Sequence, residues 1–357
     1  MKSNNELNPT AFGYRMPAEF DRHEATWLGW PSNKADWPGK FAPIPWAYAE
    51  IVRKISQGEI VRIIADPRRK QQAQRVLIRA GVDLSRIEFF NFPCDRGWLR
   101  DSGPIFLTCH GPSPELSIVR FRFNAWAKYT DWKKDRRIPE RVAKRLKMRL
   151  WPAMIGQEHF VLEGGSIDVN GKGSLLTTEE CLLDPDVQAR NSGFGRAEIE
   201  QALRTNLGVN NILWLGKGIA GDDTHGHIDD LCRFVNHRTV VLCQESNVKD
   251  ANYGPLQDNR ERLQGMKLED GSQIEVVHLP MPQPLCFDDR RLPASYANFY
   301  MANAMVLVPT FNDPMDRVAL GILSELILDR AVIGIHAVDL VWGLGAIHCL
   351  TQQQPAL

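Results

Sequence analysis

Apolar and polar residues follow a recurring order along most of this chain. Two stretches with strand-like alternation come first, then a stretch with helical spacing, and then another strand-like stretch. The first strands of four such units begin near residues 104, 166, 228 and 296, at intervals of 62, 62 and 68 residues. Their helices are expected at 139–150, 196–207, 257–268 and 313–328, and Asn170-Gly171 is a hairpin turn signal in the second unit.

The first hundred residues predict a fifth, less regular unit. Strands are expected at 26–30, 59–65 and 86–92, and helices at 45–57 and 67–81. No segment rich in Gly, Pro or Ser divides the chain, so residues 1–357 are expected to form one α/β domain. The long period suggests structural repeats around a common centre, and the alternative is an ordinary α/β sandwich.

Composition narrows the class of protein. Lys plus Arg (43) equal Asp plus Glu (43), so no excess charge points to nucleic acid or a membrane surface as a partner. Residues 1–20 have no apolar signal region, and the most apolar window, 331–350, contains His336 and Asp339, so we expect no membrane span. The seven cysteines form no CxxC pair, which argues against a disulfide framework and a thiolate zinc site and favours a reducing cytoplasm.

Two carboxylates stand beside turn residues near unit boundaries. Asp101 is followed by Ser102-Gly103-Pro104 just before a strand. Glu163 precedes Gly164-Gly165, where the backbone can approach a ligand closely. Taken alone, each is more typical of a turn or cap residue than of a functional group.

The segment 222–230 supports two interpretations. If a strand begins at Ile228, His227 and Asp229 point to the same side, and a carboxylate beside an imidazole forms an acid/base pair. If extended backbone begins earlier, His225 shares that side, and His225, His227 and Asp229 would form a metal-ligand set for a hydrolase.

Cys349 lies on an apolar segment behind a glycine-rich approach near the end of the sequence. A free cysteine is most often a buried core residue. Together with a histidine and several carboxylates, however, a thiolate suits attack on a carbon that already carries positive charge. Carboxylates would oppose an oxyanion but would bind a planar guanidinium in pairs, so the chemistry alone points to a guanidine substrate.

These motifs resemble the agmatine deiminase family, which is peptidylarginine-deiminase-like and belongs to the guanidine-modifying (pentein) superfamily. The resemblance runs through nearly the whole chain, in segments 13–20, 27–31, 98–104, 123–126, 162–167, 175–183, 226–229, 295–300 and 347–355. It implies a five-bladed α/β propeller with pseudo-fivefold symmetry and a central active site. It also implies a small guanidine as partner, no cofactor or metal, and a homo-oligomer of two or more subunits.

The resemblance assigns roles by motif. Cys349 would be the nucleophile, His227 the general acid/base, and Asp101 and Asp229 the partners of the guanidinium, with Glu163 against the imidazole. The positions implied around the rest of the substrate are Trp98, Asp223, Gly345 and Ala346. The implied reaction converts agmatine and water into N-carbamoylputrescine and ammonia through a covalent thiouronium, a step of polyamine synthesis.

Three segments depart from the family pattern. Gly343-Leu344-Gly345-Ala346 stands where three glycines and an asparagine are typical. Asp223 and His225 replace a glutamate and a smaller residue, and Ala127-Lys128 replaces glycines. Because these positions lie around the substrate's tail, arginine, peptidyl arginine or a shorter guanidine are alternative substrates for the same reaction.

Overall fold

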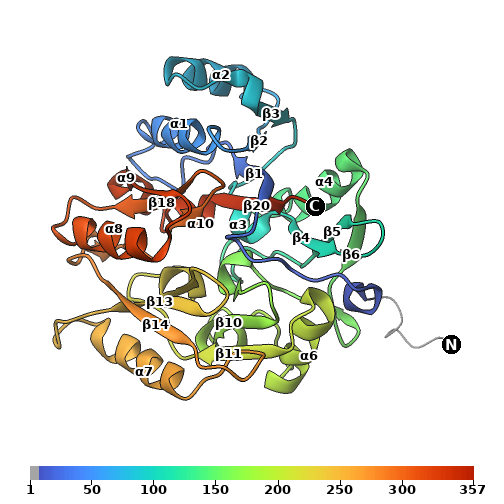
Figure 1. Cartoon of the computed structure of the whole chain (residues 1–357). Helices are drawn as coiled ribbons and strands as arrows, with labels where there is room; N and C mark the ends of the chain where they lie inside the picture. Colours follow the sequence, from blue (N-terminus) through green and yellow to red (C-terminus); the bar gives the residue numbers. More distant parts are fainter. Residues whose placement is uncertain (1–7) are drawn as a thin grey trace.

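Five mixed β-sheets of three or four strands surround a common centre in the computed structural model, which describes residues 8–357 (Figure 1). In each sheet the first strand pairs antiparallel with the second, and the second pairs parallel with the third. A parallel pair needs a crossover connection, and a helix on the outside of the molecule supplies it in every sheet.

Four units have the predicted order of strand, strand, helix and strand. The first consists of β4 (Ile105–Cys109), β5 (Glu115–Arg120), α4 (Ile138–Leu146) and β6 (Arg149–Pro152). The second consists of β9 (Asp168–Val169), β10 (Ser174–Thr178), α6 (Arg196–Leu207) and β11 (Asn211–Leu215). The third consists of β12 (Cys232–Phe234), β13 (Thr239–Gln244), α7 (Tyr253–Gln264) and β14 (Glu275–Pro280). The fourth consists of β17 (Tyr300–Met301), β18 (Met305–Thr310), α8 (Met315–Leu326) and β19 (Ala331–His336).

Several predicted boundaries are wrong. The helix expected at 257–268 lies four residues earlier, at Tyr253–Gln264. The helix expected at 139–150 ends at Leu146, because Lys147 takes the left-handed conformation (φ 56°) and the following residues enter β6. The strand expected from residue 228 begins with a 3-10 turn at Ile228–Asp230. The strand expected at 296–301 is reduced to Tyr300–Met301.

The fifth sheet joins the two ends of the chain. Its strands are β1 (His23–Gly29), β2 (Ile60–Ile64) and β3 (Ile87–Phe90), connected by α1 (Ile44–Ile55) and α2 (Lys70–Arg79), as the sequence predicts. Its outer antiparallel strand is β20 (Thr351–Pro355), which pairs with β1. Oε1 of Gln354 accepts hydrogen bonds from Trp27 Nε1 (3.0 Å) and Arg62 Nη1 (2.6 Å), so β20 is fixed by side chains as well as by its ladder.

Short elements complete the chain. They are α3 (Leu99–Ser102), β7 (Met154–Ile155), β8 (Glu158–His159), α5 (Glu179–Leu183), β15 (Cys286–Phe287), β16 (Arg290–Arg291), α9 (Val338–Val341) and α10 (Ile347–Leu350). Within residues 8–357, every helix is too short or too polar to traverse a lipid bilayer.

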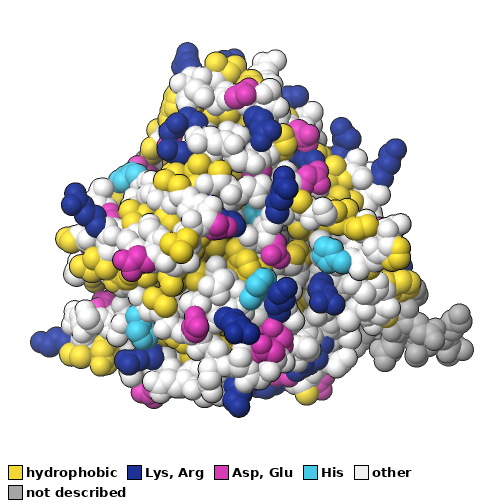
Figure 2. All heavy atoms as spheres, in the orientation of Figure 1, with side chains coloured by type: hydrophobic (Ala, Val, Ile, Leu, Met, Phe, Trp, Pro, Cys, Tyr) yellow, Lys and Arg dark blue, Asp and Glu magenta, His cyan; other side chains and the backbone are white. Residues whose placement is uncertain are grey.

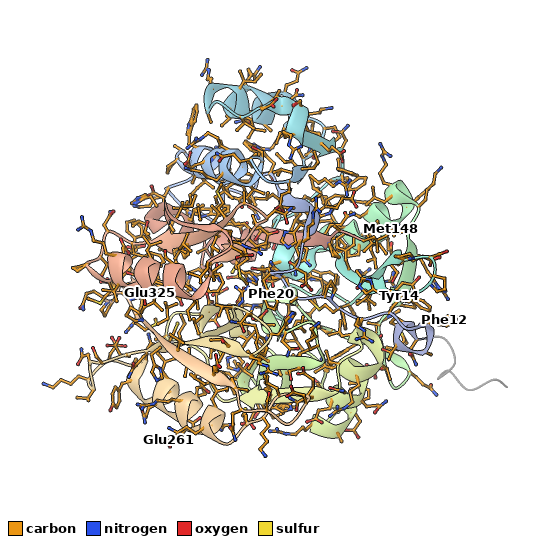
Figure 3. The ribbon with its side chains drawn as sticks, viewed as in Figure 1. Phe12, Tyr14, Phe20, Met148, Glu261 and Glu325 are labelled. Carbon is orange, nitrogen blue, oxygen red and sulfur yellow. The ribbon has the colours of Figure 1, made fainter. Side chains whose placement is uncertain are left out.

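The segment before β1 crosses the molecule toward its middle. The rings of Phe12 and Tyr14 pack against Trp151 of β6 at centroid distances of 5.3 and 5.8 Å, whereas Phe20 lies near the middle of the view (Figure 3). This path carries the neighbouring Glu19 into the interior, where it is 3% exposed.

The outer surface is polar and mixed in charge. Glu261 on α7 and Glu325 on α8 lie toward the periphery in Figure 3. Figure 2 shows Lys and Arg interspersed with Asp and Glu over the face in view, as the equal numbers of the two charge types predict.

The outer helices hold the sheets through buried apolar side chains. Leu323 of α8 is fully buried in the main apolar cluster, whereas Val318 of the same helix is 44% exposed. We expect Leu323→Ala to lower the free energy of unfolding by about 2–5 kcal/mol, because it removes buried methyl groups and leaves a cavity. Val318→Ala is the matched control and should change it by less than about 0.5 kcal/mol in the same urea titration. Equal effects of the two substitutions would contradict this packing.

Candidate active site

The predicted site residues lie on one-turn segments that precede the first strands of four sheets. Asp101 lies on α3 before β4, and Cys349 lies on α10 before β20. Glu163 and His227 stand at the N-terminal ends of the 3-10 turns Gly164–Ser166 and Ile228–Asp230, before β9 and β12. Since the first strands start near the middle of the molecule, these segments meet there.

The imidazole of His227 lies among three carboxylates, and neither of its ring nitrogens has a hydrogen-bond partner among residues 8–357. Its Nδ1 is 3.8 Å from Asp101 Oδ1 and 3.9 Å from Asp229 Oδ1, and its Nε2 is 3.6 Å from Glu163 Oε2. Both ring nitrogens and Asp229 Oδ1 are buried and have no hydrogen-bond partner among residues 8–357. Buried polar atoms are almost always satisfied, so these atoms mark a place where a polar ligand belongs.

His227 and Asp229 come together through a turn instead of a strand. The predicted alternation of a strand beginning at Ile228 is wrong, because Ile228–Asp230 is a 3-10 turn. The turn still directs His227 Nδ1 toward Asp229, and both residues are buried.

Cys349 stands next to this cluster. Its thiol donates toward Asp229 Oδ2 at 3.6 Å and accepts from Asn298 Nδ2 at 3.1 Å. Burial raises the pKa of the Cys349 thiol well above its usual value, and the charges of Asp229, Asp230 and Asp101 raise it further. The thiol is therefore protonated near neutral pH.

The pKa values of the three carboxylates differ because their partners differ. Burial raises the pKa of Asp101 to about 6. Burial also disfavours ionised Glu163, but the charge of Arg190 and the contact with His227 hold its pKa below the usual value. The pKa of Asp229 is lowered against the effect of burial by the hydrogen bond and charge of His348.

The imidazole of His227 favours the charged form. Burial lowers its pKa, but the charge of Asp101 and contacts with Cys181 and Glu163 outweigh burial, so the pKa lies well above the usual value. A protonated imidazole beside a protonated thiol is thus the resting state of the site near neutral pH.

Buried side chains contact the carboxylates from behind. His348 Nδ1 is 2.6 Å from Asp229 Oδ2, and its Nε2 is 2.8 Å from Glu19 Oε2. Glu19 also accepts from Arg100 and Arg233, and Arg190 Nε donates to Glu163 Oε2 at 3.3 Å. The bond to His348 holds Asp229 Oδ2 and leaves Oδ1 facing His227, whereas Arg190 contacts both oxygens of Glu163, including Oε2, which faces His227.

A cavity of about 350 Å³ leads to this cluster from the surface. Trp98, Asp101, Gly345 and Cys349 line its inner part, and Glu163, His227 and Asp229 lie directly behind them. Of the other predicted substrate contacts, Asp223 lines the outer part. Ala346 is only 2% exposed and is not part of the cavity wall.

The backbone around the cavity is locally strained. Leu344 has φ 68°, and Ala125, Trp126 and Ala127 have φ 52°, 58° and 53°, in the left-handed region that glycine adopts freely. The second of these turns directs Trp126 Nε1 to Asp101 Oδ2 at 2.9 Å.

The metal-ligand interpretation of His225, His227 and Asp229 does not match the geometry. His225 turns away from the cluster, with Nε2 2.8 Å from Asp184 Oδ2 and Nδ1 3.9 Å from Glu180 Oε1. In the part of the chain that the structure describes, two other triplets bring ligand atoms within 4.8 Å of one another. They are Glu163, Cys181 and His227, and Asp229, Asp230 and Cys349.

Sequence reasoning missed several residues of the site. Asn298 stands before β17, the first strand of the remaining sheet, and bonds both Cys349 and Asp230. His348 and Arg190 hold the carboxylates, and Trp126 holds Asp101. The repeat of the units could have indicated Asn298, since it lies just before a first strand as the other site residues do. No sequence signal of this kind indicates Arg190.

Comparison with known proteins agrees with this geometry. The family model for Porphyromonas-type peptidyl-arginine deiminase matches residues 15–355. The agmatine deiminase of Stutzerimonas stutzeri is 35% identical over 371 residues, which covers 98% of this chain and 97% of that protein. The agmatine deiminase of Pseudomonas aeruginosa (strain LESB58) is 34% identical, with 99% of each chain covered.

Solved structures give the same result. The agmatine deiminase of Enterococcus faecalis superposes with a TM-score of 0.90 at 30% identity, covering 98% of this chain and 97% of that one. The C. jejuni agmatine deiminase with substrate bound superposes with a TM-score of 0.84 at 31% identity, covering 96% of each chain. The chain therefore belongs to the Porphyromonas-type peptidyl-arginine deiminase family.

Proposed function

We propose that this protein hydrolyses the guanidinium group of a small guanidine, converting agmatine and water into N-carbamoylputrescine and ammonia, a step of polyamine synthesis. The observation that carries the proposal is the unpaired buried cluster of His227 and Asp229 Oδ1 beside the Cys349 thiol. A guanidinium supplies the charge and the planar donors that this cluster lacks. Agmatine is the preferred candidate because the curated relatives at 33–35% identity are named agmatine deiminases.

Asp101 and Asp229 are the proposed partners of the guanidinium nitrogens. Asp101 Oδ1 and Asp229 Oδ1 both lie within 4 Å of His227 Nδ1, so they face one small volume. The bound cation would place its carbon near Cys349 Sγ and would lower the pKa of the thiol by offsetting the surrounding carboxylates. Substrate binding would thereby create the thiolate that attacks it.

The proposed reaction has two balanced steps. Sγ of Cys349 bonds to the guanidinium carbon, and the bond from this carbon to one nitrogen breaks as that nitrogen receives a proton from His227. The proton lost by the thiol is taken up by the released ammonia, which departs as ammonium and leaves His227 neutral. The product of this step is a cationic S-alkylthiouronium. Water then attacks the same carbon, His227 accepts a proton, and the C–S bond breaks to release the ureido product and the thiol.

The five sheets are proposed to be the blades of an α/β propeller with pseudo-fivefold symmetry, formed by one domain, residues 1–357. Support comes from the shared pairing order of the sheets and from the equivalent positions of Asp101, Glu163, His227, Asn298 and Cys349 before their first strands. All seven cysteines are free thiols, which fits a reducing cytoplasm. A homo-oligomer is proposed from the family resemblance.

Ammonia release tests the function. We expect purified protein to release ammonia from at least one member of a panel of agmatine, arginine, an arginyl peptide and shorter guanidines, with agmatine among the substrates. Cys349→Ser should lower kcat/KM by more than about 10³-fold, because the covalent route is lost. Iodoacetamide should inactivate the wild type, and a metal chelator should not. A panel without any turnover, or a fully active Cys349→Ser, would refute the proposal.

A substitution at Gly165 tests whether the guanidinium binds in the space between the carboxylates. A Cβ at this position would lie 2.6 Å from His227 Nδ1, 2.8 Å from Asp101 Oδ1 and 3.0 Å from Asp229 Oδ2. We expect Gly165→Ala to lower kcat/KM by about 100-fold, because the methyl group displaces the groups that hold the guanidinium. The control is Gly321→Ala in α8, where a Cβ meets no atom within 4 Å and activity should be unchanged. Full activity of Gly165→Ala would contradict the proposed binding volume.

The pH dependence of kcat/KM should report the ionisation of the Asp101 carboxyl group. Burial raises the pKa of Asp101 to about 6, and only the ionised carboxylate can pair with the guanidinium. The ionised fraction falls as the pH is lowered, so kcat/KM should fall as the pH decreases through about 6. Steady-state rates at subsaturating substrate between pH 4.5 and 8 measure this limb, which belongs to the free enzyme. A limb near pH 4, or a flat profile, would show that Asp101 is not the limiting group.

A further inference from the structure

The outer end of the cavity contains a carboxylate that already has partners on both oxygens. Oδ1 of Asp223 accepts from Lys128 Nζ at 2.8 Å and from Arg290 Nη2 at 2.7 Å, and Oδ2 accepts from the Tyr129 hydroxyl at 2.6 Å. The Asp223 side chain is only 8% exposed. Two cations therefore face one buried carboxylate, and this end of the cavity has no surplus negative charge.

The other carboxylate in the outer wall is less accessible. Asp36 Oδ1 is 2.6 Å from Arg96 Nη1, Oδ2 has no hydrogen-bond partner among residues 8–357, and the side chain is only 1% exposed. Burial raises the pKa of Asp36 to about 7, so a large share of it is neutral near pH 7. Asp223 is therefore the more accessible acceptor, and a tail that ends in an ammonium group would have to displace a cation before it could pair with Asp223.

Arg290 has donors to spare. It lies on β16 of the β15–β16 hairpin, its side chain is 47% exposed, and it lines the cavity. Within residues 8–357 its guanidinium makes one hydrogen bond, from Nη2 to Asp223. By contrast, Arg96 in the same wall uses Nε, Nη1 and Nη2 on Asp131 and Asp36.

We infer that Arg290 determines the charge selectivity of this cavity for the substrate's tail. Its guanidinium occupies Asp223, the acceptor that an ammonium tail needs, and presents its free donors to a carboxylate tail. The inference rests on the proposed deimination at Cys349 and adds a substrate class to it, namely guanidines whose tail ends in a carboxylate. The reacting carbon, the leaving ammonia and the covalent intermediate are unchanged.

Two substrates of equal length separate tail charge from tail size. Agmatine and 5-guanidinopentanoate both have four methylene groups, and they end in an ammonium and a carboxylate. We expect the wild type to release ammonia from both. Arg290→Gln should lower the ratio of kcat/KM for the carboxylate to kcat/KM for agmatine by about tenfold or more, mainly through KM, because it removes a charged donor and one of the two cations on Asp223.

Arg291 provides the matched control. It follows Arg290 in the same short strand, but its Nη1 bonds both oxygens of Asp250, and it does not line the cavity. Arg291→Gln removes the same charge from the same hairpin and should leave the ratio within about twofold of the wild type. Continued turnover of agmatine by both variants shows that they are folded.

The outcomes distinguish this inference from the function on which it rests. Release of ammonia from neither substrate, or from any other guanidine, would refute the proposed deimination itself. Turnover of agmatine without turnover of 5-guanidinopentanoate would overturn the inference about Arg290 and leave the deimination intact. The inference also fails if Arg290→Gln leaves the ratio unchanged or if Arg291→Gln changes it equally.

Discussion

Burial of three carboxylates around a single imidazole is the constraint on which the rest of this structure depends. Removing an ionised carboxylate from water costs several kcal/mol unless charges or hydrogen bonds compensate for it. Arg190 behind Glu163 and His348 behind Asp229 supply that compensation, and Trp126 donates to Asp101. Asp229 Oδ1 and both ring nitrogens of His227 nevertheless have no hydrogen-bond partner among residues 8–357. The protein thus has a stable buried framework and an incomplete centre, which a planar cation completes.

The sheets make this arrangement possible because each contributes a short segment just before its first strand; we call these segments corners. A one-turn segment before a first strand carries its side chain to the middle, and five such segments provide Asp101, Glu163, His227 with Asp229, Asn298 and Cys349. The last corner stands close to the end of the sequence, where chains usually fray. Here Cys349 is followed at once by β20, which pairs along β1 and is anchored by Gln354. The position of Cys349 is therefore fixed by the sheet that follows it.

The sequence predicted the order of the elements and most of the centre, for physical reasons that also explain the errors. Hydrophobic periodicity predicted α6 with its observed bounds, because this helix buries one regular face. Periodicity failed at Ile228, where the polar turn around Asp229 and Asp230 is stabilised by long-range partners such as His348 and Asn298. Arg190 was invisible for the same reason, since its role depends on Glu163, 27 residues away. Local sequence patterns locate the segments that carry the site residues. They do not reveal the distant side chains that hold those residues in place.

The two ends of the cavity are built in different ways. In the proposed function the inner end carries out the reaction and the outer end selects the tail of the substrate. The inner end consists of buried corner segments that share one network, so a change in one carboxylate disturbs the pKa of the others. The outer end is formed by loops, namely the β15–β16 hairpin, the left-handed turn at Ala125–Ala127 and the approach at Leu344, and Asp223 links the first two through its hydrogen bonds. A left-handed conformation at a non-glycine residue costs about 1 kcal/mol of conformational free energy, and the interactions of the buried network offset this cost. These loops are also where the chain departs from the family pattern. Substitutions there can alter which tail is accepted while the guanidinium still meets the same thiol, imidazole and carboxylates.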